Sequence, residues 1–453
     1  MSKKPNVILI TLDALRPDHL GVYGHKKNTS PFLDSLAERG VVFKNSFSTG
    51  SATPQSFPGI LSSTYPLDFG GYSREALNKR TLISEVFQKA GYKTMGFHSN
   101  AYLSEYFGYG KGWDVFRYLN YFKNSGVSRA MRSSTWQAKF AKKLFDWETK
   151  GAEKKTIFGR IAKLLEPVIS TLRKIYLNIV RPIPPYYTAF EMNEAVKEEI
   201  KEKQNKPVFL WVHYMDAHDP YGLFLRKGKN FFPKMKSYFL DYLMTFFGEY
   251  PKVNRLFRRF YLEMYDEGIR NIDNALKELF ARLSERGILN DETAVFITAD
   301  HGEEFGEHGG FIHPQKAFGE NIKVPLIVVA PEKFAGEPGK TETPRSLIDL
   351  APTMLAYSGI SQPANFRGKN IFDGEERDVI IELSTHEADL SGISLKASAI
   401  ISEGHKLIKM KSCSLLFSLD DPRDEKNLFG KNEKIDSLLG KKLEKFLNSN
   451  RNK

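Results

Sequence analysis

Short apolar runs alternate along the chain with longer segments of helical periodicity. Five of these runs are rich in β-branched and aromatic residues and predict strands, over residues 6–12, 93–98, 208–212, 294–298 and 324–330. Between them, apolar residues recur at the spacing of an amphipathic helix over residues 31–39, 81–90, 189–202 and 262–286. Strands that alternate with helices are typical of an α/β protein whose largely parallel sheet is covered by helices on both faces.

Polar residues that could bind a ligand or take part in catalysis follow four of the predicted strands. Asp13 follows the first, Asn100 the second, His218 the third, and the pair Asp300-His301 the fourth. In parallel sheets of this kind, ligands bind outside the carboxyl ends of the strands. We therefore expect these side chains to converge on one edge of the sheet.

The pattern changes after about residue 375. Short alternating segments at residues 379–382, 397–402 and 405–408 predict antiparallel strands, and residues 433–447 predict a closing helix. We expect a main domain over residues 1–375, which holds the candidate chemistry, and a small antiparallel C-terminal subdomain over residues 376–453.

Positive charge is concentrated in two segments. The whole chain of 453 residues has a net charge of +12. Residues 121–186 contain fourteen basic and four acidic residues, and residues 223–262 contain nine basic and two acidic residues among many aromatics. We interpret them as basic helical insertions at about 120–190 and 222–262, which are either solvated faces or a contact for an anionic surface or polyanionic substrate. We do not expect nucleic acid as a partner, because no nucleic-acid-binding motif accompanies the charge.

Other features of composition exclude several classes of protein. The single cysteine, Cys413, excludes an intrachain disulfide and any metal site built from four cysteines. Hydrophobic residues make up 41% of the chain, which is typical of a globular protein. The sequence shows neither a signal peptide nor an apolar stretch of about 18 residues, so it predicts a soluble, cytoplasmic protein.

Candidate metal-binding residues are most concentrated in the glycine-rich segment 299–309, which contains Asp300 and His301. Neighbouring carboxylate and imidazole groups at a strand end can reach one ion, and this combination suits zinc or manganese. Carboxylates alone would favour calcium or magnesium. The alternative is a polar loop without a metal.

A second candidate is Thr53, which Pro54 follows. This order predicts a helix with Thr53 as its N-cap and proline in the first helical position. Pro58, one turn later, does not favour this helix because it removes a backbone hydrogen bond. A hydroxyl there lies at the positive end of a helix, and contact with a metal would make it a nucleophile. The alternative is a plain helix cap.

Together these motifs resemble the sulfatase family of the alkaline phosphatase superfamily, nearly from end to end. The resemblance rests on the segments 6–13, 16–24, 31–37, 40–43, 213–221, 300–303, 346–353 and 417–428. It implies the family's α/β fold, with a largely parallel sheet flanked by helices. It also implies an enzyme that acts on ester bonds of sulfate or phosphate.

The family's nucleophile falls on Thr53, in the register set by residues 60–66. Sulfatases have Cys or Ser there, followed at fixed spacing by Pro-Ser-Arg, and the first residue becomes formylglycine. Here Gln55 replaces the Pro, Ser56 matches, and Phe57 replaces the Arg. Threonine cannot become formylglycine, so none is expected. Thr53 instead resembles the nucleophile of phosphoethanolamine and phosphoglycerol transferases.

The resemblance also implies a site for one divalent metal ion: Zn, Mn, Ca or Mg. Its ligands would be Asp13, Thr53, Asp300 and His301, because Ala14 stands where calcium-type sulfatases have a second Asp. The resemblance gives His218, His313 and Lys316 catalytic roles at the leaving or transferred group, and Ser56 and Asn100 roles in substrate binding. Ordinary structural roles stay open for these residues, as does a second ion held by Asp216, His218 and His313. His213 and His308 receive no assignment.

The sequence thus predicts a metal-dependent hydrolase of sulfate or phosphate esters with Thr53 as nucleophile. Its substrate would be a small molecule or an ester linked to a glycan or lipid; the threonine slightly favours phosphorus. One alternative is a transferase that moves a phospho-alcohol onto a glycan or lipid. Another is an inactive homologue that binds a metal. The sequence does not indicate an oligomeric state.

Overall fold

The computed structural model describes residues 4–119, 186–201, 204–219, 221, 255–385 and 394–450. Most of the two predicted basic insertions lies outside these residues. The last residues of the second one, from 255 onward, belong to a long helix, α11 (Arg255–Glu285), which begins seven residues before the predicted start.

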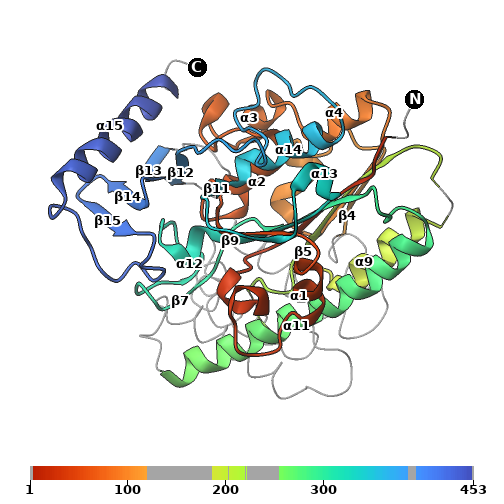
Figure 1. Ribbon diagram of the computed structural model, residues 1–453, viewed down its shortest axis with the longest axis horizontal. Helices are drawn as coiled ribbons and strands as arrows, with labels where there is room; N and C mark the ends of the chain where they lie inside the picture. The colour runs from red at the N-terminus through yellow and green to blue at the C-terminus, as the bar shows by residue number, and fades with distance from the viewer. Residues whose placement is uncertain are drawn as a thin grey trace, which may run out of the picture.

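A nine-stranded sheet lies at the centre of the described structure (Figure 1). The order of eight strands is β10-β2-β9-β6-β1-β5-β3-β4, and β11 pairs with β2. Their bounds are β1 Val7–Leu12, β2 Val41–Phe47, β3 Lys93–His98, β4 Val115–Tyr118, β5 Val208–Tyr214, β6 Ala294–Ala299, β9 Lys323–Val329, β10 Gly339–Thr341 and β11 Arg345–Ser346. Only β9 runs antiparallel to its neighbours, β2 and β6. The predicted largely parallel sheet is confirmed, with β2, β4, β10 and β11 as strands that the pattern did not predict.

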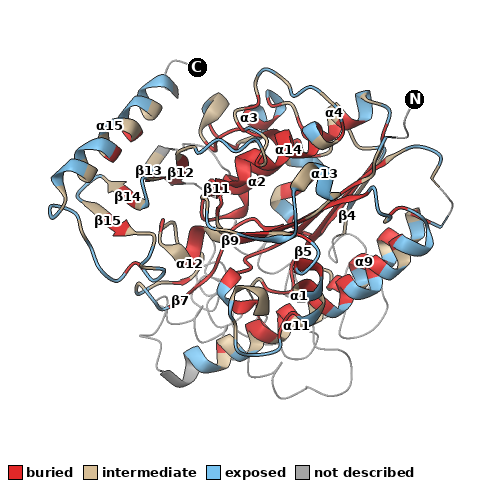
Figure 2. Ribbon diagram, in the orientation of Figure 1, coloured by how far each residue is buried: buried red, intermediate tan, exposed pale blue. Residues whose placement is uncertain are grey.

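Helices cover both faces of this sheet (Figure 1). On one side lie α1 (Pro31–Ala37), α9 (Ala189–Glu199) and α11; on the other lie α2 (Thr53–Ser62), α4 (Ile83–Lys89) and α14 (Leu350–Tyr357). Every residue of β1, β5 and β6 is buried (Figure 2), which explains why these strands are continuous apolar runs. Within the described part of the chain, no helix has the length and apolarity required to span a membrane.

The strands that carry candidate residues share one direction. β1 runs parallel to β5 and β6, and β3 runs parallel to β5. Leu12, the last residue of β1, pairs with both Tyr214 and Ala299. Asp13 and Asp300 therefore leave the sheet side by side, as the strand pattern predicted.

The C-terminal part forms a separate antiparallel sheet. Its strands, in the order β12-β13-β14-β15, are Val379–Thr385, Ser394–Ser402, His405–Met410 and Ser414–Ser418. Helix α15 (Glu433–Asn450) packs on this sheet, where Leu439 and Leu443 are buried against Ile400 and Leu407. The predicted small antiparallel subdomain is confirmed, with β15 as an additional strand.

Glu382 of β12 lies where this sheet meets the main domain. Its N–H donates to the Thr49 carbonyl at 3.0 Å, and its carboxylate accepts from the Leu67 N–H at 2.9 Å. Burial raises the pKa of Glu382 from 4.5 to about 7, although the Leu67 hydrogen bond and the charges of Arg367 and Arg80 act in the opposite direction.

Glu382→Gln should therefore make the protein less sensitive to rising pH. The folded state binds the Glu382 proton more tightly than the unfolded state, so stability falls as pH rises from about 4.5 to about 7. The loss amounts to roughly 3 kcal/mol. Urea unfolding at pH 5 and pH 8 would measure it, with exposed Glu375→Gln as control. Equal pH dependence of Glu382→Gln and wild type would contradict this assignment.

Candidate active site

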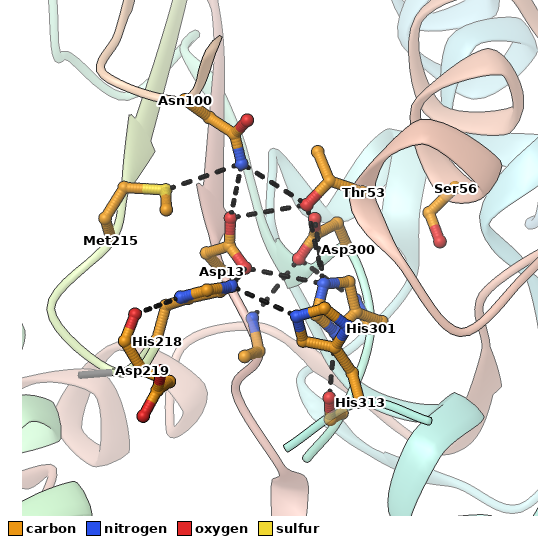
Figure 3. Close-up of polar contacts among 12 residues, drawn as sticks. Asp13, Thr53, Ser56, Asn100, Met215, His218, Asp219, Asp300, His301 and His313 are labelled. Carbon is orange, nitrogen blue, oxygen red and sulfur yellow. Dashed lines mark hydrogen bonds and ion pairs between the residues drawn. The ribbon is translucent and has the colours of Figure 1, made fainter. Parts of the chain in front are cut away.

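Five predicted residues meet at the carboxyl edge of the sheet: Asp13, Thr53, Asn100, Asp300 and His301 (Figure 3). The Thr53 hydroxyl lies 3.5 Å from Asp13 Oδ2 and 3.4 Å from His301 Nε2. The Asn100 amide donates to Asp13 Oδ2 at 3.0 Å and to the Thr53 hydroxyl at 3.3 Å. All five residues are at least nine-tenths buried. The strand ends and the start of α2 thus bring a hydroxyl, two carboxylates and an imidazole into one cluster.

Each carboxylate has one oxygen that accepts no hydrogen bond from the described residues: Asp13 Oδ1 and Asp300 Oδ2. The other oxygen of Asp300 accepts from the N–H groups of Ala14 and His301, at 3.3 and 3.0 Å. A buried anionic oxygen without a donor is costly unless a cation compensates it. Two such oxygens in one cluster therefore fit a metal ion.

The hydrogen bonding of His301 fits the same role. His301 Nδ1 lies 2.8 Å from the Gly302 carbonyl oxygen, which can only accept, so Nδ1 carries the proton. His301 Nε2 then presents a lone pair, and it lies 3.4 Å from Asp13 Oδ1 and 3.6 Å from Asp300 Oδ2. A backbone carbonyl that fixes the opposite nitrogen is typical of a histidine that binds a metal. Asp13, Thr53, Asp300 and His301 are thus the residues that could hold the ion.

The two carboxylates affect each other's ionisation. Burial and the charge of Asp13 raise the pKa of Asp300. Burial also opposes the ionisation of Asp13, but a hydrogen bond from His213 and interaction with the neighbouring imidazoles of His218, His213 and His301 hold its pKa below the ordinary value. A divalent ion held by these carboxylates would relieve their repulsion.

The backbone around the cluster requires two unusual features. Ala14 has a φ of +57°, and Tyr265 of α11 fixes this turn because its hydroxyl donates to the Ala14 carbonyl at 2.7 Å. At Gly302, a Cβ atom would lie 2.0 Å from the Glu320 carbonyl oxygen. Only glycine lets the loop after His301 approach that segment.

The start of helix α2 differs from the prediction by one position. Ala52, in extended conformation, is the N-cap; Thr53 and Pro54 are the first two helical residues. The predicted N-cap role of Thr53 is therefore wrong, and its hydroxyl is left to face Asp13 and His301. Gln55 and Ser56 donate their N–H groups to the Ala52 carbonyl. These two N–H groups are therefore bonded within the helix and are not free to bind a transferred group.

His218 and His313 form a second pair beside the cluster (Figure 3). Their Nε2 atoms lie 3.3 Å apart, and His218 Nε2 lies 3.9 Å from Asp13 Oδ1. His218 Nδ1 lies 2.5 Å from the Asp219 carbonyl oxygen, to which it donates. Burial, followed by the charges of His301 and His218, holds the pKa of His313 well below its ordinary value. The two imidazoles are placed to share one proton beside Asp13.

The structure does not bring two of the predicted residues into the cluster. The Ser56 hydroxyl donates to the Gly50 carbonyl at 3.1 Å and lies apart from the other side chains in Figure 3. The Lys316 ammonium donates to the Glu304 carboxylate and, at 2.8 Å, to the His308 carbonyl. These contacts hold Lys316 within its own loop.

The possible second ion set is not assembled either. Asp216 Oδ1 accepts from the Ala189 N–H at 3.2 Å and from the Asn271 amide at 2.5 Å. This carboxylate therefore joins α9 to α11, and among the described residues no candidate metal group combines it with His218 and His313.

One contact of the cluster was not predicted from the sequence. His213 of β5 is fully buried, and its Nε2 lies 3.0 Å from Asp13 Oδ2. The pairing of Thr11 with His213 in the sheet creates this contact. A histidine inside an apolar strand has no local signal of that neighbour, so strand order was needed to find it.

Comparison with known proteins gives one family. The family model described as Sulfatase matches residues 5–360. A similar protein is the ulvan-active sulfatase of Formosa agariphila, which is 24% identical over 97% of this chain and 81% of its own length.

Two solved structures share the fold. The phosphonate monoester hydrolase of Agrobacterium radiobacter has a TM-score of 0.68 and 16% identity, over 99% of this chain and 96% of its own. The protein BT4656, in complex with its substrate D-glucosamine-2-N,6-O-disulfate, has a TM-score of 0.69 and 16% identity, over 99% of each chain.

Proposed function

Because the chain belongs to the sulfatase family, whose members are hydrolases of sulfuric ester bonds, we propose that it is a metal-dependent ester hydrolase with Thr53 as nucleophile. One observation carries this proposal: the buried Thr53 hydroxyl lies 3.4 Å from the unprotonated nitrogen of His301, beside two carboxylate oxygens that accept no hydrogen bond from the described residues. A hydroxyl in this setting is placed for activation rather than for capping a helix.

The donor set supports one divalent ion held by Asp13, Thr53, Asp300 and His301. Two carboxylates, an imidazole and a hydroxyl suit zinc or manganese better than calcium or magnesium. When bound, the ion would lower the pKa of the Thr53 hydroxyl and balance the charge that develops on the transferred group.

The protein's own groups then account for both steps. Thr53 Oγ1, which has given up its proton to solvent, forms a bond to sulfur or phosphorus while the ester bond breaks, and the departing oxygen takes the proton that His218 and His313 share. The Asp219 carbonyl orients His218 for this transfer. In the second step, water attacks the same sulfur or phosphorus atom and returns a proton to the imidazole pair, which frees Thr53.

Thr53 also bears on the choice between sulfur and phosphorus. Oxidation of a threonine side chain gives a ketone, not the aldehyde of formylglycine, so the covalent intermediate must break by attack at the central atom. Phosphorus accepts such attack readily, which favours phosphonate or phosphate esters as a second candidate.

The fold is shared with a phosphonate monoester hydrolase and with a protein bound to a disulfated glucosamine. We therefore propose a sugar-linked ester as the substrate class.

A panel of nitrophenyl esters tests this function: sulfate, phosphate monoester, phosphate diester and phosphonate, with protein loaded separately with Zn²⁺, Mn²⁺, Ca²⁺ and Mg²⁺. We expect turnover that depends on the ion, with Zn²⁺ or Mn²⁺ most effective. Release of product only when an acceptor alcohol is added would indicate a transferase. Metal binding without turnover of any ester would contradict the proposal and indicate an inactive homologue.

A further inference from the structure

His213 could bind the metal by distance alone, because its ring nitrogen and the carboxylate oxygens of Asp13 and Asp300 lie within 4.8 Å of one another. We propose that it does not. We infer that His213 is a positioning residue: it donates its Nε2–H to Asp13 Oδ2 and thereby turns Asp13 Oδ1 toward the metal position. This inference rests on the proposed function, but its test does not require activity.

A chain of hydrogen bonds to Asp13 begins at Trp211, on the same strand as His213. Trp211 Nε1 lies 2.9 Å from the Thr11 hydroxyl oxygen, and an indole N–H can only donate. The Thr11 oxygen thus accepts from Trp211, and its own hydrogen remains available to donate. All three side chains are fully buried, so water does not compete for these bonds.

The Thr11 hydroxyl fixes the tautomer of His213. Thr11 Oγ1 lies 2.9 Å from His213 Nδ1, which gives the hydroxyl hydrogen an acceptor. With Nδ1 as acceptor, the proton of the neutral imidazole is on Nε2. A protonated Nδ1 would instead make Thr11 accept twice and leave a buried hydroxyl hydrogen without an acceptor among the described residues.

Asp13 is the target of this chain of hydrogen bonds. His213 Nε2 and the Asn100 amide each lie 3.0 Å from Asp13 Oδ2, so this oxygen accepts two N–H groups. Asp13 Oδ1 accepts no hydrogen bond from the described residues and lies 3.4 Å from His301 Nε2. The two donors therefore set the rotation of the carboxylate and reserve Oδ1 for the ion.

His301 and His213 thus contact the same carboxylate with opposite tautomers. His301 has its proton on Nδ1, bound to the Gly302 carbonyl, and presents a bare Nε2. His213 presents an Nε2–H. A nitrogen that carries a proton cannot bind a metal, so the hydrogen-bond partners of the two rings separate a ligand from a positioning residue.

Long-range ¹H–¹⁵N spectra of protein with ¹⁵N-labelled histidine rings test the inference directly in the metal-free protein. His213→Gln and His301→Gln assign the two rings by loss of their signals. We expect the proton on Nε2 in His213 and on Nδ1 in His301. A proton on Nδ1 of His213 would overturn the proposal, whether or not any ester is hydrolysed.

Co²⁺ gives a second readout, because its visible spectrum reports the ligands. His213→Gln keeps an N–H donor near the Nε2 position, so its Co²⁺ spectrum should match the wild type, whereas His301→Gln should lose the imidazole contribution. Thr11→Val should weaken Co²⁺ binding about 10-fold, because without the Thr11 hydroxyl the proton of His213 is no longer fixed on Nε2. Thr11→Ser, which keeps the hydroxyl, should restore binding. Equal loss of the Co²⁺ spectrum in His213→Gln and His301→Gln would overturn the proposal.

Discussion

Thr53→Ala is expected to lower kcat by roughly 1,000-fold or more on the best ester. The substitution removes the atom that attacks sulfur or phosphorus, and loss of a nucleophile costs rates of this order. Because Asp13, Asp300 and His301 remain, the variant should still bind the metal. Stopped assays at saturating substrate, together with metal analysis of the purified variant, would measure both effects.

Thr53→Ser is the matched control for this experiment. Serine keeps the hydroxyl at the start of α2 and removes only a methyl group, so it should recover most of the activity that Thr53→Ala loses. Full activity in Thr53→Ala would show that the nucleophile is another group, such as water.

Asp300→Asn should abolish the stabilisation that the metal gives to the folded protein. Replacing a ligand should weaken metal binding by more than the 10- to 100-fold that is typical for loss of a hydrogen-bond partner of a ligand. The metal-free variant should nevertheless be more stable than metal-free wild type at pH 8, because one of two neighbouring buried carboxylates is gone.

Thermal unfolding with and without Zn²⁺ or Mn²⁺ would measure both effects of Asp300→Asn. Asp216→Asn is the control, because this buried carboxylate bonds Ala189 and Asn271 outside the cluster and its loss should leave the metal-induced shift in Tm intact. A metal-induced shift of wild-type size in Asp300→Asn would remove Asp300 from the ligand set.

The strand pattern was sufficient to place the core of this site. Asp13, Asn100, His218 and Asp300 each follow an apolar run, and parallel strands bring such positions to one edge of the sheet. The sulfatase resemblance then added Thr53, which lies on a helix and has no strand to place it. Sequence alone therefore predicted the α/β fold and most of the cluster.

The residues that sequence could not place depend on partners distant in the chain. Lys316 is held by Glu304, and the turn between β7 (Glu304–Phe305) and β8 (Phe311–Ile312) decides this contact. His213 meets Asp13 only because β5 is the neighbour of β1 in the sheet. Neither a loop conformation nor a strand order follows from local hydrophobic periodicity.

The stereochemical course of transfer to water tests the central claim most directly. A phosphonate ester made chiral at phosphorus by two oxygen isotopes would be hydrolysed in water that carries the third isotope, and the configuration of the released phosphonate determined. Attack by Thr53 followed by attack of water inverts the centre twice, so we predict net retention. Net inversion would mean that water attacks the substrate in a single step, and it would contradict a covalent intermediate on Thr53.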